Sequence, residues 1–150
     1  MTARSIEHAS FTIERRYGVP PDRVFAAWAD PAAKARWFRG PDDWVASGHE
    51  LDFRVGGLEE TSGGPPGGPV HTYRALYWDI VPDARIVYTY EMLTGGVRMS
   101  VSLATVVLCS DGDGTRLVVT EHGAFLDGIE DPALREHGTG ALLDALGRTL

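Results

Sequence analysis

The 150-residue sequence has little of several features that would narrow its function at once. It contains one cysteine, Cys109, so no disulfide can form within the chain. Its basic residues form no cluster, and a net charge of −7 argues against a nucleic-acid or anionic-membrane surface. No apolar stretch approaches the roughly 20 residues that span a bilayer, and the N-terminal residues lack an apolar signal core. We therefore expect a cytoplasmic protein with no nucleic-acid partner and no membrane insertion.

Motifs for metal, nucleotide and hydrolase chemistry are also missing. None of the histidines stands three or four residues from another, and no HExxH or Cys-His cluster exists. The serines form no GxSxG motif, and the GGPPGG stretch lacks the Lys-Ser/Thr pair of a phosphate-binding loop. The sequence therefore predicts no metal site and no cofactor. The histidines are His8, His49, His71, His122 and His137.

The composition is that of one soluble globular domain over residues 1–150. Hydrophobic residues make up 43% and charged residues 23% of the chain, which is ordinary for such proteins. No internal repeat is present, and the one low-complexity stretch is SGGPPGGP at residues 62–69. Because glycine and proline disfavour a helix or a central strand, we interpret this stretch as a mobile hairpin loop between two strands.

Alternating apolar residues predict a succession of strands, and two Asp-Pro pairs mark helices. Val19 to Asp22 starts a first short helix, Asp30-Pro31 opens a second, and Asp131-Pro132 is a typical start for the final helix. That final helix has an apolar stripe of Leu134, Ala141, Leu142, Ala145 and Leu146. The expected strands contain Phe11–Arg16, Leu51–Val55, Val70–Val81, Ile86–Met92, Val97–Leu103 and Leu117–Glu121. The order predicts an α+β fold in which a curved antiparallel sheet wraps around one long C-terminal helix.

Five segments, taken together, resemble a known family. They are VPPDRVFAAWADPAAKARWF, LDFRVGG, DIVPDARIVYTYE, GDGTRLVVTEHG and GTGALLDAL, which follow one another along almost the whole chain. In this order they are similar to the activator of heat-shock-protein-90 ATPase homologue family, within the START-related (SRPBCC) helix-grip superfamily. The resemblance implies a helix-grip fold with a cavity between sheet and helix.

The superfamily includes lipid carriers, hormone receptors, polyketide cyclases and antibiotic-sequestering proteins, so the resemblance leaves the function open. Thr139 stands where a Trp is expected after the helix glycine, and the loop at residues 62–69 is long. Both differences lie where a cavity mouth would be, so a relative's ligand does not transfer to this chain. The eukaryotic co-chaperone usually carries a separate N-terminal chaperone-binding domain, for which 150 residues leave no room, so direct chaperone activation is not the leading expectation.

A set of mainly aromatic and apolar residues is predicted to line the cavity. Aromatic rings supply contact area, and tyrosines add hydroxyl groups that can orient a ligand. The alternative for each of these residues is that it fills the core. The predicted cavity residues are Trp37, Phe53, Trp78, Tyr88, Tyr90, Met99, Val101, Glu121, His137 and Leu142.

Glu121 and His137 are the candidates for acid-base chemistry. Glu121 shares strand parity with Leu117 and Val119, which places it inward, whereas His122 then faces outward. A buried Glu among apolar groups has a raised pKa and can act as a general acid or base. Pairing of Glu121 with Arg54 or Arg98 is the favoured alternative, and for His137 a structural hydrogen bond is favoured too.

Three functions remain open. The first is a non-catalytic protein that binds or sequesters a small hydrophobic molecule (aromatic, polyketide-like or lipid-like), with the loop at residues 62–69 as a gate. The second is a polyketide cyclase or dehydratase-like enzyme that uses Glu121 or His137 in the same cavity. The third is a stress-response or chaperone-linked interaction module without a ligand. Because relatives often pair through sheet edges or helices, a homodimer is a further expectation.

Overall fold

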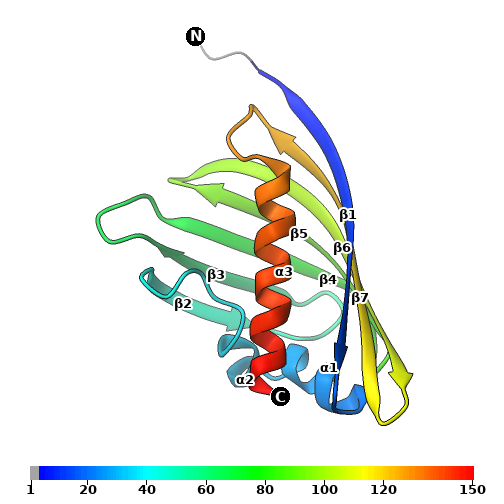
Figure 1. The fold of residues 1–150 in the computed structure, drawn as a ribbon. Coiled ribbons are helices and arrows are strands. Elements are labelled where there is room, and N and C mark those ends of the chain that lie inside the picture. The colour runs from blue at the N-terminus through cyan, green and yellow to red at the C-terminus, as the bar shows by residue number, and fades with distance from the viewer. Residues whose placement is uncertain (1–3) are drawn as a thin grey trace.

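The computed structural model describes residues 4–150, which form seven strands and three helices (Figure 1). Within these residues, no helix is long and apolar enough to cross a membrane. The elements are β1 (Ile6–Tyr17), α1 (Pro21–Ala29), α2 (Pro31–Ala35), β2 (Val45–Leu51), β3 (Leu58–Gly64), β4 (His71–Val81), β5 (Arg85–Thr94), β6 (Val97–Asp111), β7 (Gly114–Leu126) and α3 (Pro132–Thr149).

The strands form one antiparallel sheet in the order β1-β7-β6-β5-β4-β3-β2. β1 and β2 are therefore its two edges, and α1 and α2 connect them across one end of the sheet. The sheet curves around α3, with α1 and α2 near the C-terminal end of that helix (Figure 1). This arrangement confirms the predicted helix-grip fold.

Aspartate caps begin the second and third helices, as the Asp-Pro pairs predicted. The Asp30 carboxylate accepts a hydrogen bond from the backbone N–H of Ala33 at 3.0 Å, and that of Asp131 accepts one from Ala133 at 3.0 Å. Each cap satisfies an N–H group that has no partner inside the helix. Proline follows each aspartate, where its missing N–H is harmless.

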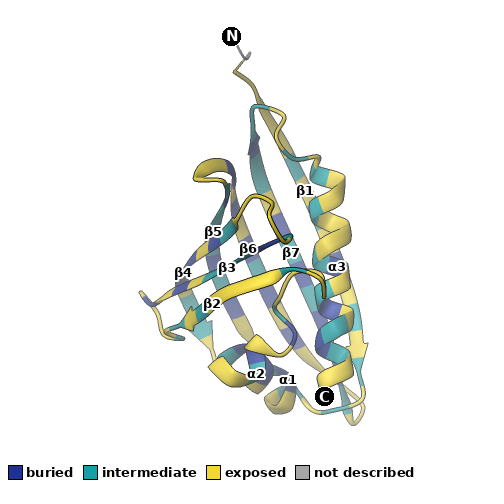
Figure 2. Cartoon of the chain, turned by 90° about the vertical axis from the view of Figure 1, so that its left-hand side faces the viewer, coloured by how far each residue is buried: buried dark blue, intermediate teal, exposed yellow. Residues whose placement is uncertain are grey.

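The core lies between the concave face of the sheet and the helices. Buried residues alternate with exposed ones along the strands (Figure 2), as expected for a sheet with one solvated face. α1 contributes Val24 and Trp28 to the core, and α3 contributes Leu143 and Leu146. The predicted inward parity of Leu117, Val119 and Glu121 on β7 is confirmed.

The predicted strand from Leu51 to Val55 is wrong, because β2 ends at Leu51. Residues 52–57 form a tight turn closed by the hydrogen bond from Asp52 N to Leu58 O at 2.9 Å. Gly57 permits this turn, since a Cβ there would lie 2.0 Å from the carbonyl oxygen of Asp52. The predicted loop at residues 62–69 does connect two strands, but β3 continues through Gly64.

Of the two residues of β6 that were predicted to face inward, Met99 is buried and Val101 is not. Val101 and Leu103 are exposed on the convex side, and the inward residues are Ser102 and Ala104. Ala104 lies opposite Tyr88 and Ser102 opposite Tyr90, so small residues leave room for the tyrosine rings. Cys109 is exposed on the same strand.

The buried face of α3 differs from the predicted apolar stripe. It is formed by Gly140, Leu143 and Leu146, whereas Leu134 is 65% exposed. A Cβ at Gly140 would meet the Arg15 side chain at 3.2 Å. The helix therefore lies close to a β1 side chain at a position where it has no side chain of its own, and the apolar pattern alone did not reveal this.

Candidate interior binding site

Four tyrosines from β4 and β5 cover the centre of the concave face. Tyr73, Tyr77, Tyr88 and Tyr90 are all buried, because alternate residues of each strand point to the same side. Tyr77 pairs with Tyr88 across the strands, and the ring centroids of neighbouring tyrosines lie 5.0–6.1 Å apart. The result is an aromatic surface with phenolic hydroxyls between the sheet and α3.

At one end of this surface lies a buried ionic group, the Lys34 cluster, formed by Lys34, His49, Glu59 and Tyr77. Lys34 is the only lysine of the chain and is 0% exposed. Its ammonium donates to Glu59 at 2.6 Å and to the Tyr77 hydroxyl at 3.1 Å. Tyr77 also donates to Glu59 at 2.7 Å, and the second Glu59 oxygen lies 2.7 Å from Nε2 of His49.

Aromatic rings enclose the Lys34 ammonium. Its Nζ lies 4.5 Å from the ring centroid of Phe38 and 5.3 Å from that of Trp28. The rings of Tyr77 and Tyr88 follow at 5.8 and 6.0 Å. The negative faces of such rings attract a cation, which adds to the attraction of Glu59.

Burial and pairing act in opposite directions in this cluster. Burial lowers the pKa of Lys34, and the nearby Glu59 only partly offsets it. Burial by itself raises the pKa of Glu59, but Lys34, His49 and Tyr77 together outweigh this effect and leave the pKa lowered. Glu59 is therefore held as a carboxylate inside the protein.

A second buried group, the Glu121 cluster, consists of Tyr90, Ser100, Glu121, Glu130 and Arg135. The Tyr90 hydroxyl donates to Glu121 at 2.5 Å and accepts from Arg135 at 3.1 Å. Arg135 also donates to Ser100 at 2.8 Å and to Glu130 at 2.9 Å. Because Arg135 belongs to the first turns of α3, these bonds attach the helix to β5 and β6.

The carboxyl of Glu121 is 4% exposed and has a raised pKa. Burial is the main cause, and it outweighs the hydrogen bond from Tyr90 and the charge of Arg135, which both favour the carboxylate. Burial and the neighbouring Glu121 also raise the pKa of Tyr90. This environment favours the protonated form more than water does, which makes the carboxyl a candidate acid or base.

Two buried hydrogen-bond donors lie beside the Lys34 cluster. Within the described residues, neither the Tyr73 hydroxyl nor the Trp28 indole N–H has a hydrogen-bond partner. The Phe38 ring contacts Tyr73 edge-on at 4.8 Å between centroids and also faces Lys34. An unpaired donor inside a protein costs about 1–3 kcal/mol, so a ligand atom that accepted from Tyr73 would be favoured.

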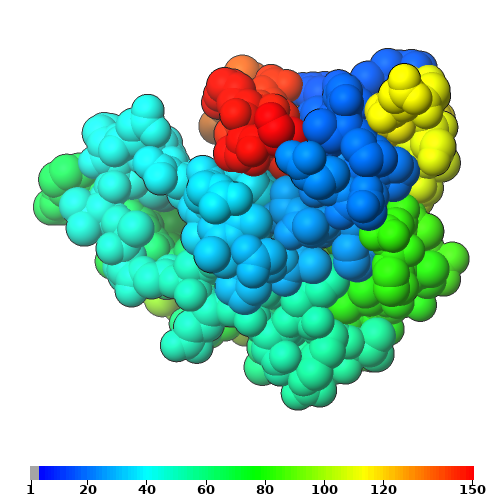
Figure 3. Space-filling view, turned by 90° about the horizontal axis from the view of Figure 1, so that it is seen from below, coloured from blue at the N-terminus to red at the C-terminus, as the bar shows by residue number. Residues whose placement is uncertain are grey.

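Half-buried residues mark the outer part of this region. Phe38, Met92 and Leu142 pack against the core while remaining partly accessible. The surface is indented between the cyan segment that leads into β2 and the red C-terminal part of α3 (Figure 3). This indentation lies on the side of α3 that faces away from β1.

Several predicted cavity residues do come together at the concave face. Tyr88, Tyr90 and Glu121 are neighbours there, and the partly buried Leu142 of α3 packs against the same core. Trp37 is buried below them, where its indole N–H donates to Ala27 O at 2.9 Å. Two further predicted cavity residues, Phe53 and Met99, are buried or half-buried. The Phe53 ring packs against those of Phe25 and Tyr77, and Met99 lies at the bulge between β5 and β6.

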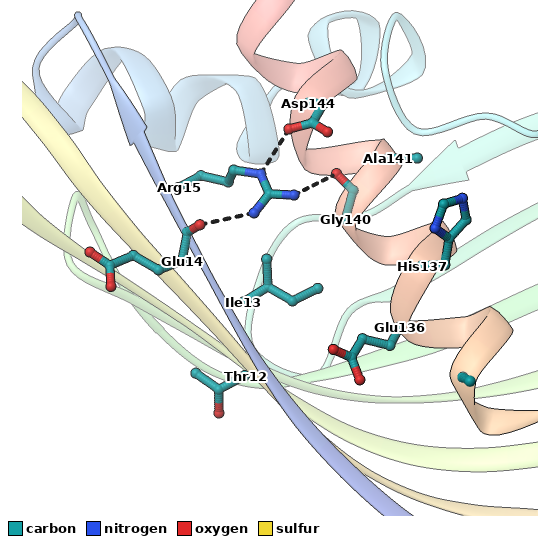
Figure 4. A pocket seen from close by; sticks show the side chains of 10 residues that line it. Thr12, Ile13, Glu14, Arg15, Glu136, His137, Gly140, Ala141 and Asp144 are labelled. Atoms are coloured by element: carbon teal, nitrogen blue, oxygen red, sulfur yellow. Dashed lines mark hydrogen bonds and ion pairs between the residues drawn. The ribbon is translucent and has the colours of Figure 1, made fainter.

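Three predicted cavity residues do not face the interior. Trp78 is 57% exposed and bonds Thr89 on the convex side, and Val101 is 45% exposed. The reason is strand parity, which assigns Tyr77 and Ser102 to the inside and their neighbours to the outside. His137 is exposed on α3, in a groove next to β1 (Figure 4). The predicted partners of Glu121 are also wrong, since Arg54 pairs with Asp52 and Arg98 with Glu91.

Sequence patterns did not identify four residues of the site: Lys34, Glu59, Tyr73 and Arg135. One signal was available, because the chain has a single lysine among thirteen arginines, and it stands in an aromatic segment. No local pattern marks Glu59 as its partner, since that contact is formed only by folding. In residues 4–150, no group of three or more His, Cys, Asp or Glu side chains is arranged to hold a metal ion.

Comparisons with known proteins agree with this fold. A protein of Rhizobium leguminosarum is 46% identical, with 99% of this chain and 97% of that chain covered and a TM-score of 0.93. The Mll3558 protein from Rhizobium loti is 49% identical, with 97% and 99% covered and a TM-score of 0.90. CalU16 from Micromonospora echinospora is 26% identical, with 99% and 85% covered and a TM-score of 0.60. No curated protein matches the sequence at a significant level.

The sequence itself matches a family over residues 18–150, nearly the whole chain. This match confirms the resemblance seen in the five segments. The chain belongs to the family of Activator of Hsp90 ATPase homolog 1-like proteins.

Proposed function

We propose that the protein binds a small hydrophobic molecule, aromatic, polyketide-like or lipid-like, between the concave face of the sheet and α3. The observation that carries this proposal is the tyrosine surface with an unpaired Tyr73 hydroxyl. Aromatic surface with a few polar groups is typical of small-molecule sites. The ligand reaches the interior through the indented side of α3, next to Phe38 and Leu142.

The polar groups of the interior select the chemistry of the ligand. Glu59 and Glu121 already accept hydrogen bonds from protein donors. Tyr73 is a donor without a partner. The site therefore favours a ligand with an acceptor, such as a carbonyl oxygen, on an otherwise apolar ring system.

A pair of probes that differ by one acceptor tests this function. Fluorenone carries a carbonyl oxygen and fluorene does not, while their ring systems match. We expect the wild type to bind fluorenone about 3- to 10-fold more tightly, which corresponds to one hydrogen bond. Tyr73→Phe removes this preference. Tyr17→Phe is the control, because the Tyr17 hydroxyl already donates to Leu143 O at 2.8 Å.

The measurement is a titration followed by intrinsic fluorescence, with calorimetry to count sites. Binding of neither probe to the wild type contradicts an interior site for planar aromatic compounds. Equal binding of both probes keeps the interior site and contradicts the role of Tyr73. An equal loss of preference in Tyr17→Phe shows that the effect arises from general loosening.

A second function, proton transfer to a bound ligand, has support from Glu121. This carboxyl has a raised pKa, accepts from Tyr90 and lies on the concave face. Glu121→Gln keeps the shape and removes the exchangeable acid. With a cyclase or dehydratase, the variant binds ligand and loses turnover, whereas a carrier shows no turnover to lose.

A further inference from the structure

Lys34 is a buried amine that ligand binding alone does not require. It is the only lysine beside thirteen arginines, and it is 0% exposed. An ion pair in such a place seldom stabilises a fold more than apolar residues of the same volume. An arginine pairs with a carboxylate at least as well, but only a lysine can lose its proton and attack carbon. The residue type therefore indicates a nucleophile.

The surroundings of the Lys34 Nζ atom suit an amine that gains and loses protons. Glu59 accepts from it at 2.6 Å, and the Tyr77 hydroxyl, 3.1 Å away, donates to the same carboxylate. Burial lowers the pKa of Lys34, so its free amine forms more readily than that of an exposed lysine. The second Glu59 oxygen lies 2.7 Å from Nε2 of His49, whose side chain is 12% exposed. His49 therefore connects the buried carboxylate with the surface.

The strand next to Glu59 leaves room for a carbonyl group beside the amine. Glu59 lies opposite Ala75 of β4, so a methyl group stands there between two inward tyrosines. The centroid of the Phe38 ring is 4.5 Å from Lys34 Nζ and 4.8 Å from the centroid of the Tyr73 ring. A carbonyl oxygen that accepts from the unpaired Tyr73 hydroxyl therefore brings its carbon close to the amine.

Access to the amine depends on Phe38. This side chain is half-buried and packs against the core from the loop after α2. When its ring turns outward, the Nζ atom of Lys34 opens to the interior site. An aromatic ligand then replaces the Phe38 ring beside the cation, so the cation keeps an aromatic neighbour.

We propose that Lys34 forms a reversible imine with the carbonyl carbon of an aromatic aldehyde or ketone held in the interior. This inference rests on the proposed binding function. The nitrogen of Lys34 forms a bond to the carbonyl carbon, and the carbon–oxygen bond breaks. The oxygen leaves as water with two protons of the ammonium, and Glu59 carries each of them from nitrogen to oxygen. The product is a protonated imine, and no oxidant or reductant takes part.

The reaction leaves the buried charge unchanged. The ammonium and the protonated imine each carry one positive charge, so Glu59 stays paired with a cation throughout. A step that destroyed this cation would leave a buried carboxylate without a partner, which is strongly unfavourable. The existing ion pair therefore favours the imine as a product.

Reductive trapping with 2-naphthaldehyde and cyanoborohydride at neutral pH tests the proposal. The hydride converts the imine into a stable amine, and the protein gains the mass of the aldehyde less one oxygen atom. Peptide mapping distinguishes Lys34 from the N-terminal amine. We expect Lys34 to be labelled at least about 10-fold faster in the folded protein than in guanidinium chloride, because the site holds the aldehyde beside the amine. A lysine buried only for structure reacts more slowly when folded.

Two controls separate covalent capture from binding. Methyl 2-naphthoate has the same ring system and a carbonyl oxygen but forms no imine. It is expected to bind without a label and to slow the labelling of Lys34 by the aldehyde. The variant that combines Lys34→Met with Glu59→Gln has no buried amine, and it is expected to bind the ester and to take up label only at its N-terminus.

The outcomes distinguish this inference from the proposed function. Binding of the ester without faster labelling of folded Lys34 overturns the imine and leaves the interior site in place. Absence of both ester binding and label contradicts both proposals. Label at the N-terminal amine alone overturns the imine. Labelling of Lys34 that saturating ester does not slow also overturns it, because the aldehyde then reacts without occupying the interior.

Discussion

At the scale of single residues, the Lys34 cluster is the most demanding feature of the molecule. A lysine with no exposed surface depends on the carboxylate 2.6 Å away and on the rings around it. Removing one member of a buried pair leaves the other charge uncompensated, which is far more harmful than replacing both. Lys34 and Glu59 therefore depend on each other, and neither can be replaced alone without loss of stability.

Lys34→Met is expected to lower the free energy of unfolding by about 3–5 kcal/mol, because Glu59 is left charged and buried. Adding Glu59→Gln recovers most of this loss, since the remaining buried group is neutral and still bonds Tyr77. Urea denaturation of the two variants measures both values. If Lys34→Met alone is as stable as the wild type, Glu59 is not ionised in the folded protein.

Glu121 predicts a specific dependence of stability on pH. Its pKa is raised in the folded protein, so its protonated form stabilises the fold at low pH, and this contribution is lost as pH rises through the folded pKa. Glu121→Gln removes the titration. We expect its stability relative to the wild type to improve between pH 4 and pH 8, as measured by urea denaturation at each pH. A difference that is constant or shrinks with pH contradicts the raised pKa.

For single residues, the sequence predicted best the side of the sheet to which a strand residue points. Tyr88, Tyr90 and Glu121 were placed correctly from alternation, because a regular strand fixes the side to which each residue points. Trp78 and Val101 were misplaced because apolar character was taken as a sign of burial. Lys34 and Glu59 are 25 residues apart in the chain, and only the packed structure reveals their pairing.

At the scale of elements, α3 holds the interior closed through few side chains. Arg135 ties its start to Tyr90 and Ser100, and the Tyr17 hydroxyl holds its later part through Leu143 O. Two of the three glycines of the helix have contrasting surroundings. Nothing lies within 4 Å of a Cβ at Gly138, whereas one at Gly140 meets Arg15 at 3.2 Å.

Gly138→Ala is expected to raise the free energy of unfolding by about 1 kcal/mol, the difference in helix propensity between the residues. Gly140→Ala gains less, because the Arg15 guanidinium must shift away from Gly140 and Asp144. Thermal and urea unfolding of the pair measure this contrast. Equal gains would mean that Arg15 does not fix the distance between α3 and β1.

Most helices and strands could be predicted from the sequence. Which side of each element is buried was harder to predict. Asp-Pro pairs and alternation identified the helix starts and most strands, because these signals are local. The turn at residues 52–57 was missed, since it depends on the close approach of Gly57 to Asp52 O. The contact face of α3 depends on Gly140, a residue that carries no hydrophobic signal.

At the scale of the whole molecule, a curved sheet and one helix separate two surfaces. The concave face provides apolar area with the Lys34 and Glu121 clusters at its ends. The groove beside β1 is lined by residues of β1 and α3 and lies at a free edge of the sheet. The fold alone supports many functions in such proteins, so the chemistry of these surfaces distinguishes them.

The central claim is that the interior holds a small hydrophobic molecule. Native mass spectrometry of the gently purified protein tests it most directly, with denaturing extraction to identify whatever is released. We predict a discrete excess mass that disappears on unfolding and belongs to an apolar compound with a hydrogen-bond acceptor. The sample is then incubated with fluorenone, and a 1:1 complex is predicted. A protein that shows only its own mass in both experiments contradicts the claim.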